Sequence, residues 1–506
     1  MNTPSFRLFF ISFCFVLFSC TQSSPNSETN KNLFNLLTVK NIIDSQSTCN
    51  PNNRGSFWVR NLSTSSQATY CVNSTLVGSS NNIDLYLENG LSTNLNYTNI
   101  VDAFESNIFP IMEDAFGVPS DLNRDGKVTV LILDIKDGAT ASSGFVAGFV
   151  DPVNFYADNV AYSIRSNQRE ILFMDGVELV RLRDKDLTSG KPDTFLSTLA
   201  HEFQHLIRFQ YSQGADDTWI DEGTSEVSSD LAGYGPQNAR ISCFKGDANS
   251  SSSCTGGIGS SSLGNPSLFN WTSTLKNYAY AYSFMKYVYE SSGIDVTSRN
   301  TFFRQSVQGI NGTRATNAYN LMTIFMNSPN FNTNLMTSDS KTAFKRLMAS
   351  FLGQAVGYTN LNSVYFGNTT AVNIDSVRTT YPFSSTLSVL STPTPFSSIA
   401  KPSSFSLNPS QVSRVRGLTS GLTSGSSDFV IVSNGNTEFV IFNGDNIGSK
   451  TNFSSGVASI ASLIEYPELD LYTGSEIVCP NEHFKQIHNI EKSKFSLKLY
   501  EHQHNN

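Results

Sequence analysis

The chain contains few charged residues. Asp, Glu, Lys and Arg make up 15% of its 506 residues, whereas an average globular protein has about 25%. The 42 acidic residues outnumber the 34 basic ones, so the formal net charge is −8. A protein that binds nucleic acid needs a basic surface that displaces counterions from phosphate. The composition therefore argues against nucleic acid as a partner.

Long apolar runs are also missing. No segment reaches about 18 apolar residues, the length at which a membrane-spanning helix is recognised, so a polytopic membrane protein is excluded. Hydrophobic residues are nevertheless common, at 39%, and the chain has 37 Phe and 19 Tyr. This composition excludes an intrinsically disordered chain and suffices for about two or three domains with cores of their own.

The N-terminus has the pattern of an export signal. A single cation, Arg7, precedes an apolar run over residues 8–18, and Cys20 follows the sequence Leu-Phe-Ser. This ending resembles a bacterial lipobox, which predicts that residues 1–20 are a lipoprotein signal peptide and that the Cys20 thiol is acylated. A plain secretory signal with an incidental cysteine is the alternative. Residues 21–55 begin with a polar, turn-rich stretch and are expected to form a tether.

The expected location is therefore the bacterial cell envelope, at the outer membrane or cell surface, with release into the medium as a further possibility.

Export permits disulfides. Cys49 and Cys71 flank one turn-rich stretch, and Cys243 and Cys254 flank another. Both pairs are plausible disulfides, although spacing does not fix the connectivity. No CxxC pair occurs, which argues against a thiolate zinc site.

Apolar periodicity predicts an α+β core followed by a β-rich region. We expect a core domain over residues 56–355, a β-rich domain over 356–480 and a charged tail over 481–506. The expected helices cover residues 99–116, 194–210, a stretch after Trp219, 278–290 and 341–353. The expected strands cover residues 57–60, 69–72, 83–87 and 128–135, with a hairpin formed by 429–432 and 439–442.

Two histidines stand four residues apart inside one expected helix. His201 and His205 would lie one turn apart on the same face, and Glu202 directly follows the first. This spacing lets two imidazoles bind one Zn²⁺ and places a carboxylate beside them. A zinc site that hydrolyses substrates has three protein ligands and one open position, so a third ligand is needed.

The third ligand is expected in the segment that follows. Sixteen residues separate His205 from Glu222, which suits a return to the metal by a helix–turn–helix. Glu226 lies one turn further and can accept the outer N–H of a ligand histidine. The spacing also leaves Glu226 open as the third ligand. A third histidine of the metzincin type is excluded, because Tyr211 stands at its position.

The motif HEFQH followed by WIDEGTSE resembles the gluzincin metallopeptidases, and within them the hyicolysin-type secreted bacterial enzymes. The resemblance extends over residues 83–290. It includes Phe104-Glu105, Ala115-Phe116-Gly117, the Asp121 loop, Gly148-Phe149 with Asp151-Pro152, the stretch 171–175 and the stretch 197–205. It implies a gluzincin-like core with His201, His205 and Glu222 as zinc ligands and Glu202 as the catalytic carboxylate.

The resemblance also implies an oxyanion donor well downstream of the ligand glutamate. Tyr278 and Tyr282 are the candidates, on one face of the expected helix, and ordinary core tyrosines are the alternative. The stretch 278–282, which contains both tyrosines, resembles the family only loosely.

A second ion site is suggested by the loop DLNRDGK. Asp121, Asn123 and Asp125 alternate before Gly126, as in the first half of an EF-hand-type Ca²⁺ loop. The twelfth position is an isoleucine, so Asp134 or Asp137 would have to complete the shell. A structural Ca²⁺ is one interpretation, and a solvated polar turn is the other.

These observations predict a lipid-anchored, zinc-dependent endopeptidase that acts on protein or peptide substrates outside the cell. Glu202 would serve as general base and general acid. One alternative is a catalytically silent adhesin or binding lipoprotein on a metallopeptidase scaffold. Another is a structural lipoprotein in which HEFQH is accidental.

Overall fold

The computed structural model describes residues 49, 55–139, 144–161, 163–247, 252–258, 267–269, 271–272, 274–367, 370–391, 399–400, 412–416, 429–433, 438–444 and 460–464. The predicted signal peptide with Cys20, nearly all of the predicted tether, Cys479 and the tail lie outside these residues. Within the described part, no helix has both the length and the apolarity needed to cross a bilayer.

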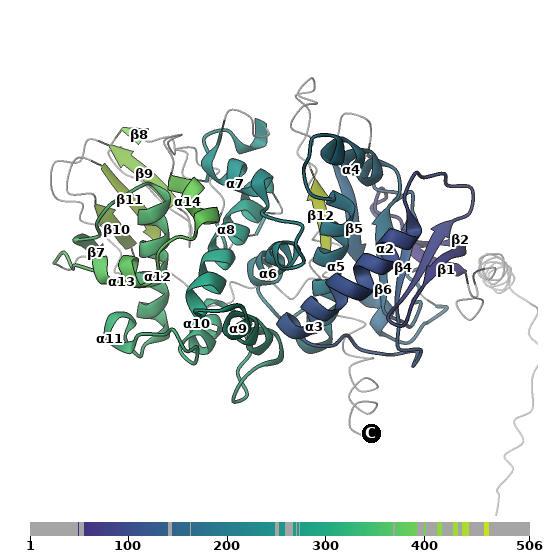
Figure 1. The fold of residues 1–506 in the computed structure, drawn as a ribbon, viewed down its shortest axis with the longest axis horizontal. Coiled ribbons are helices and arrows are strands. Elements are labelled where there is room, and N and C mark those ends of the chain that lie inside the picture. Colours follow the sequence, from purple (N-terminus) through teal and green to yellow (C-terminus); the bar gives the residue numbers. More distant parts are fainter. Residues whose placement is uncertain are drawn as a thin grey trace, which may run out of the picture. The chain divides into compact units, whose positions relative to one another are not determined.

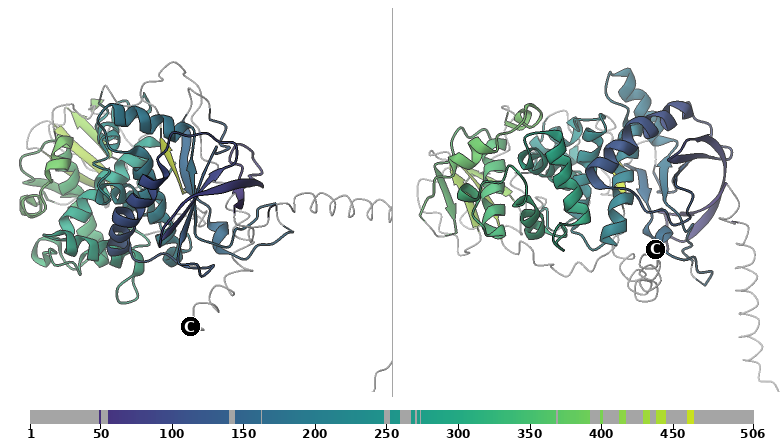
Figure 2. Two further views of the ribbon diagram at one scale, coloured as in Figure 1. Left: turned by 45° about the vertical axis from the view of Figure 1, so that its right-hand side comes forward. Right: turned by 60° about the horizontal axis from the view of Figure 1, so that its bottom comes forward.

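The first sheet has seven strands in the order β1-β2-β3-β4-β6-β5-β12 (Figure 1). Its strands β3, β4 and β6 are parallel, and its other pairs are antiparallel. The strands fan out with the usual twist (Figure 2). Their bounds are β1 (Ser56–Arg60), β2 (Thr69–Ser79), β3 (Ile83–Glu88), β4 (Val128–Leu133), β5 (Phe145–Val150), β6 (Ile171–Asp175) and β12 (Ile460–Ile464).

The strand expected at residues 128–135 is β4, in the middle of this sheet. All six of its residues are buried, as expected for an apolar run in a parallel region covered on both faces. The helix expected at 99–116 is continuous as α2 (Tyr97–Ala103), a π-helical turn η1 (Phe104–Ile108) and α3 (Phe109–Phe116). It ends at Gly117, whose φ of 107° favours glycine.

The remaining helices form a layer beside the sheet and a helical subdomain after it. Their bounds are η2 (Pro152–Phe155), α4 (Glu178–Thr188), α5 (Thr194–Ser212), α6 (Thr218–Leu231), α7 (Asn238–Lys245), η3 (Ser252–Cys254), α8 (Leu275–Ser292), α9 (Val296–Gln308), α10 (Ala318–Phe325), α11 (Thr333–Met336), α12 (Ser340–Ala355), α13 (Asp375–Thr380), α14 (Ser385–Ser388) and η4 (Val389–Ser391). The mixed sheet followed by helices confirms the predicted α+β class.

The second sheet has five strands in the order β7-β10-β11-β9-β8. The predicted hairpin is confirmed by antiparallel pairing of β10 (Phe429–Ser433) with β11 (Glu438–Asn443). The other strands are β7 (Ser363–Phe366), β8 (Ile399–Ala400) and β9 (Val412–Arg416). Strand β12 comes from the range expected to be part of the β-rich domain, yet it pairs with β5 of the first sheet.

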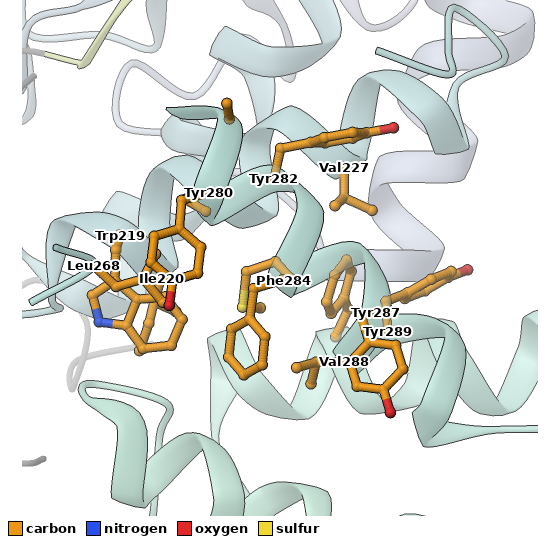
Figure 3. Packing of buried hydrophobic residues seen from close by; sticks show 14 of the residues in the cluster. Trp219, Ile220, Val227, Leu268, Tyr280, Tyr282, Phe284, Tyr287, Val288 and Tyr289 are labelled. Carbon is orange, nitrogen blue, oxygen red and sulfur yellow. The ribbon is translucent and has the colours of Figure 1, made fainter. Parts of the chain in front are cut away.

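Helix α8 lies at the centre of the core between α6 and α7. Figure 3 shows its aromatic side chains packed among residues of α6 such as Trp219 and Val227. Five tyrosines of α8 are at most 5% exposed: Tyr278, Tyr280, Tyr282, Tyr287 and Tyr289. Burying these large rings stabilises the contact between α6, which is part of the site described below, and the helical subdomain.

Both disulfides expected from the sequence are present. Cys49 pairs with Cys71, and Cys243 pairs with Cys254. The second disulfide joins α7 to η3. It thus fixes the end of the helix that carries Arg240, a residue of the site described below.

A buried carboxylate at the end of β6 gives the fold a pH-dependent stability. Asp175 accepts hydrogen bonds from the backbone of Val177 and Leu179, but burial raises its pKa to about 7. The folded state therefore keeps this proton between pH 3.8 and about 7, where the unfolded chain has lost it. The resulting contribution to stability is complete below the unfolded pKa and is lost as pH rises towards 7.

We therefore expect Asp175→Asn to stabilise the protein at pH 8 by about 2 kcal/mol and to have much less effect at pH 4. The amide oxygen can still accept from Leu179, and the side chain no longer ionises. Denaturant unfolding at both pH values measures this difference. A change in the free energy of unfolding that is equal at both pH values would contradict the explanation.

Candidate metal centre

Helix α5 buries both histidines and the glutamate of the HEFQH motif. Asp193 caps the helix by accepting from the backbone N–H groups of Phe195 and Leu196. The helix then runs between the sheet and α6 (Figure 1). Its polar residues His201, Glu202 and His205 are at most 3% exposed. Burial of three ionisable side chains on one apolar helix is costly unless they have partners.

Strand β5 passes close to Glu202. A Cβ atom at Gly148 would lie 3.0 Å from Cγ of Glu202 and 3.1 Å from the carbonyl oxygen of Phe173. The absence of a side chain at 148 therefore leaves room for the glutamate between α5 and the sheet. This contact explains the glycine in the Gly148-Phe149 pair quoted above.

Helix α6 brings Glu222 back to α5, as the spacing predicted. The next residue, Gly223, faces α8, where a Cβ would lie 2.5 Å from Cγ of Met285 and 2.9 Å from the carbonyl oxygen of Ala281. Glycine thus permits a close approach of α6 to α8. Glu222 itself is 1% exposed.

Three ligand atoms converge between these helices. Nε2 of His201 lies 3.1 Å from Nε2 of His205. Each of these nitrogens lies 3.4 Å from Oε2 of Glu222. A tetrahedral Zn²⁺ with bonds of about 2.0–2.1 Å holds its ligand atoms about 3.3 Å apart. The triangle therefore has the size that zinc requires.

The polar environment of the triangle also fits a divalent cation. Oε2 of Glu222 is buried and has no hydrogen-bond partner of good geometry. Carboxylates outnumber guanidinium groups around the imidazoles, and this excess of negative charge favours a bound cation. The carboxylates belong to Asp221, Glu222 and Glu226, and the guanidinium groups belong to Arg208 and Arg240.

The same charge imbalance appears in the proton affinity of the site. Burial by itself lowers the pKa of His205, but the carboxylates of Asp221 and Glu222 outweigh it and raise the pKa to about 10. Burial opposes ionisation of Glu222 too, yet the adjacent imidazoles hold the pKa of this carboxyl below its usual value. The cluster thus attracts positive charge, which a metal ion or a proton can supply.

Two further carboxylates contact the outer nitrogens of the imidazoles. Oδ1 of Asp221 lies 3.0 Å from Nδ1 of His205. Oε1 of Glu226 lies 4.0 Å from Nδ1 of His201 and accepts from Nε and Nη2 of Arg240 at 3.0 and 2.7 Å. At hydrogen-bond distance, the Asp221 carboxylate holds the Nδ1 proton of His205 and leaves its Nε2 free for a metal, whereas Glu226 lies beyond hydrogen-bond distance of His201.

The geometry distinguishes Glu222 from Glu226, which the spacing had left as alternative third ligands. Glu222 faces the Nε2 atoms, whereas Glu226 is on the Nδ1 side and pairs with Arg240. Asp221 was not anticipated. The sequence feature that could have identified Asp221 is its position directly before Glu222, on the helix that returns to the second histidine.

The two candidate oxyanion donors differ in their surroundings. The hydroxyl of Tyr282 donates to Oδ2 of Asp230 at 2.8 Å. Tyr278 is 1% exposed and packs edge-on against Trp271. The guanidinium of Arg240 lies 5.2 Å from the centre of the Tyr278 ring. Tyr278 is therefore next to the residue that holds Glu226, and Tyr282 belongs to a separate cluster.

The loop proposed for Ca²⁺ is satisfied largely by its own amide groups. Oδ1 of Asp121 accepts from the Gly126 N–H at 3.1 Å, and Oδ1 of Asp125 accepts from the Lys127 N–H at 2.9 Å. The Asn123 amide donates to Asp125. Asp134 converges instead with Asp175 and Glu178. Calcium binding by Asp121, Asn123 and Asp125 stays a prediction.

No protein-family model matches the chain. It is similar to the neutral metalloprotease ShpI of Staphylococcus hyicus, with 29% identity over 216 residues. The match covers 41% of this chain and 45% of that protein, so the chain spans less than half the length of the relative. The chain is thus a distant homologue of a neutral metalloprotease, and it has a buried His-His-Glu site of the kind that zinc occupies.

Proposed function

We propose that the chain is a zinc-dependent endopeptidase that hydrolyses peptide bonds of extracellular proteins. The observation that carries the proposal is the triangle of His201 Nε2, His205 Nε2 and Glu222 Oε2, whose edges of 3.1–3.4 Å match a tetrahedral zinc site. The printed name of the relative, a neutral metalloprotease, supports protein as the substrate class.

The three side chains would hold the ion, and the ion would supply Lewis acidity to a carbonyl group and to water. Asp221 keeps the proton of His205 on Nδ1, so that Nε2 presents its lone pair to the site. Glu226 lies at the corresponding nitrogen of His201, where Arg240 fixes its orientation. The chain thus presets the imidazole of His205 before a substrate arrives.

Glu202 is proposed as the group that moves protons. Gly148 leaves room for its side chain over β5. The carboxylate would accept a proton from the attacking water and deliver it to the leaving amine nitrogen. Tyr278 is the proposed donor to the developing oxyanion, because it lies beside Arg240 and not in the Asp230 cluster.

Export of the protein is supported by its two disulfides. Acylation of Cys20 lies outside the described residues and stays a prediction, and so does the attachment to a membrane. Both disulfides are compatible with either a lipid-anchored or a released protein.

The proposal is tested with the purified full chain and an unfolded protein as substrate. We expect one zinc per chain, cleavage of the substrate, loss of cleavage with a chelator and recovery when Zn²⁺ is restored. Zinc binding without turnover on any protein would favour a binding lipoprotein on this scaffold. Absence of both zinc and turnover would leave HEFQH as an accidental motif.

A further inference from the structure

Arg208 is a guanidinium buried at the end of α5, and the proposed reaction does not use it directly. Its side chain is fully buried. Its Nε lies 2.9 Å from Oδ2 of Asp216, and its Nη2 donates to the carbonyl oxygen of Ala315 at 3.0 Å. Nη1 donates to the hydroxyl of Thr224 on α6 at 3.4 Å.

The same guanidinium contacts the carboxylate that holds His205. Its Nε lies 3.7 Å from Oδ1 of Asp221, and this oxygen is the one that lies 3.0 Å from Nδ1 of His205. A continuous chain of contacts therefore connects Arg208, through Asp221, to one edge of the metal triangle. On its other side, Asp216 is also held by Arg314, with distances of 3.0 and 2.8 Å.

On the basis of the proposed function, we propose that Arg208 is a positioning residue of the metal centre. It holds Asp221 against Nδ1 of His205, and thereby keeps Nε2 aimed at the metal. The side chain of Asp221 is 16% exposed, so without this contact it could turn towards water. The guanidinium is suited to the task because its planar fork reaches Asp216, Asp221 and α6 at once.

A lysine at this position separates geometry from charge. Arg208→Lys keeps the positive charge, so the Coulomb energy between residue 208 and the metal changes little. Its single ammonium cannot make the same set of contacts. We expect the Kd for Zn²⁺, measured by competition with a chromophoric chelator, to rise about tenfold, as for other residues that orient a metal-binding imidazole.

Asp221→Asn shows whether the effect passes through Asp221. This variant alone should also raise the Kd for Zn²⁺ about tenfold. Adding Arg208→Lys to it should change the Kd by less than about twofold, because the two residues act on one interaction. The absorption bands of the Co²⁺-loaded protein should shift alike in both single variants.

Arg60→Lys is the matched control. Arg60 is also buried and makes a two-atom contact with a carboxylate, Asp151, with both distances at 2.9 Å. Its replacement should lower the free energy of unfolding without changing the Kd for Zn²⁺. If the wild-type chain binds no zinc, the proposed function fails.

If the wild-type chain binds zinc and Arg208→Lys binds it equally well, only the role of Arg208 is refuted. An additive effect in the double variant would refute it too. Arg208→Gln serves as a second variant if the lysine variant does not fold. Failure of both to fold, with normal zinc affinity in Asp221→Asn, would make Arg208 a purely structural residue.

Discussion

Replacement of Glu202 by glutamine is expected to reduce peptide cleavage by about 10²–10⁴-fold, the usual contribution of a general acid–base group. Glutamine has nearly the same shape as glutamate, so it should fit the space over Gly148 in which the wild-type side chain lies. Its amide cannot accept a proton from water or return one to the leaving amine. The loss should appear in kcat rather than in substrate binding.

The bound zinc should remain in the Glu202→Gln variant, because Glu202 is not among the three converging ligands. Metal analysis of the purified variant and steady-state cleavage of an unfolded protein measure the two quantities together. Glu113→Gln, which makes the same chemical change at an exposed position of α3, is the control and should keep full activity. Cleavage above a tenth of the wild-type rate would contradict the role given to Glu202.

Replacement of Glu222 by glutamine should release the metal. The change removes the charge of a buried carboxylate that lies 3.4 Å from both imidazole nitrogens. Loss of one partner from a buried ionic cluster costs about 3–5 kcal/mol, which corresponds to an increase in the Kd for Zn²⁺ of about 10²–10⁴-fold. The rise in Tm that zinc gives to the wild-type protein should shrink accordingly.

Glu226→Gln is the matched comparison, since it makes the same change four residues further along α6. Glu226 lies on the Nδ1 side of His201, so its replacement should raise the Kd for Zn²⁺ by only about tenfold. Competition with a chelator and thermal unfolding with and without zinc measure both variants. The reverse order of the two effects would make Glu226 the third ligand.

Much of the site follows from local sequence rules. Asp193 is a strong N-cap, and apolar periodicity predicted the helix that holds both histidines. A spacing of four residues then fixed their common face. The return of Glu222 followed from the length of the connecting segment. Each of these inferences depends on neighbours in the chain, where helix geometry leaves few alternatives.

The rest of the site depends on contacts between distant segments. Arg240 reaches Glu226 from α7, and Ala315 accepts from Arg208 although 107 residues separate them. No spacing rule predicts such pairs, because they arise from how the helices pack. Arg208 is an example. A basic residue near the C-terminal end of a helix is usually explained by its interaction with the helix dipole, whereas Arg208 is fully buried and contacts distant segments. The pairing of β12 with β5 is equally non-local.

The proposed function depends most directly on the position of one zinc ion. Anomalous diffraction from zinc-loaded crystals, recorded at the zinc absorption edge, locates that atom without reference to any assumed ligand. We expect one strong peak bonded to Nε2 of His201, Nε2 of His205 and a carboxylate oxygen of Glu222, with Glu226 outside bonding distance. A peak elsewhere, or no zinc between the two imidazoles, would contradict the account.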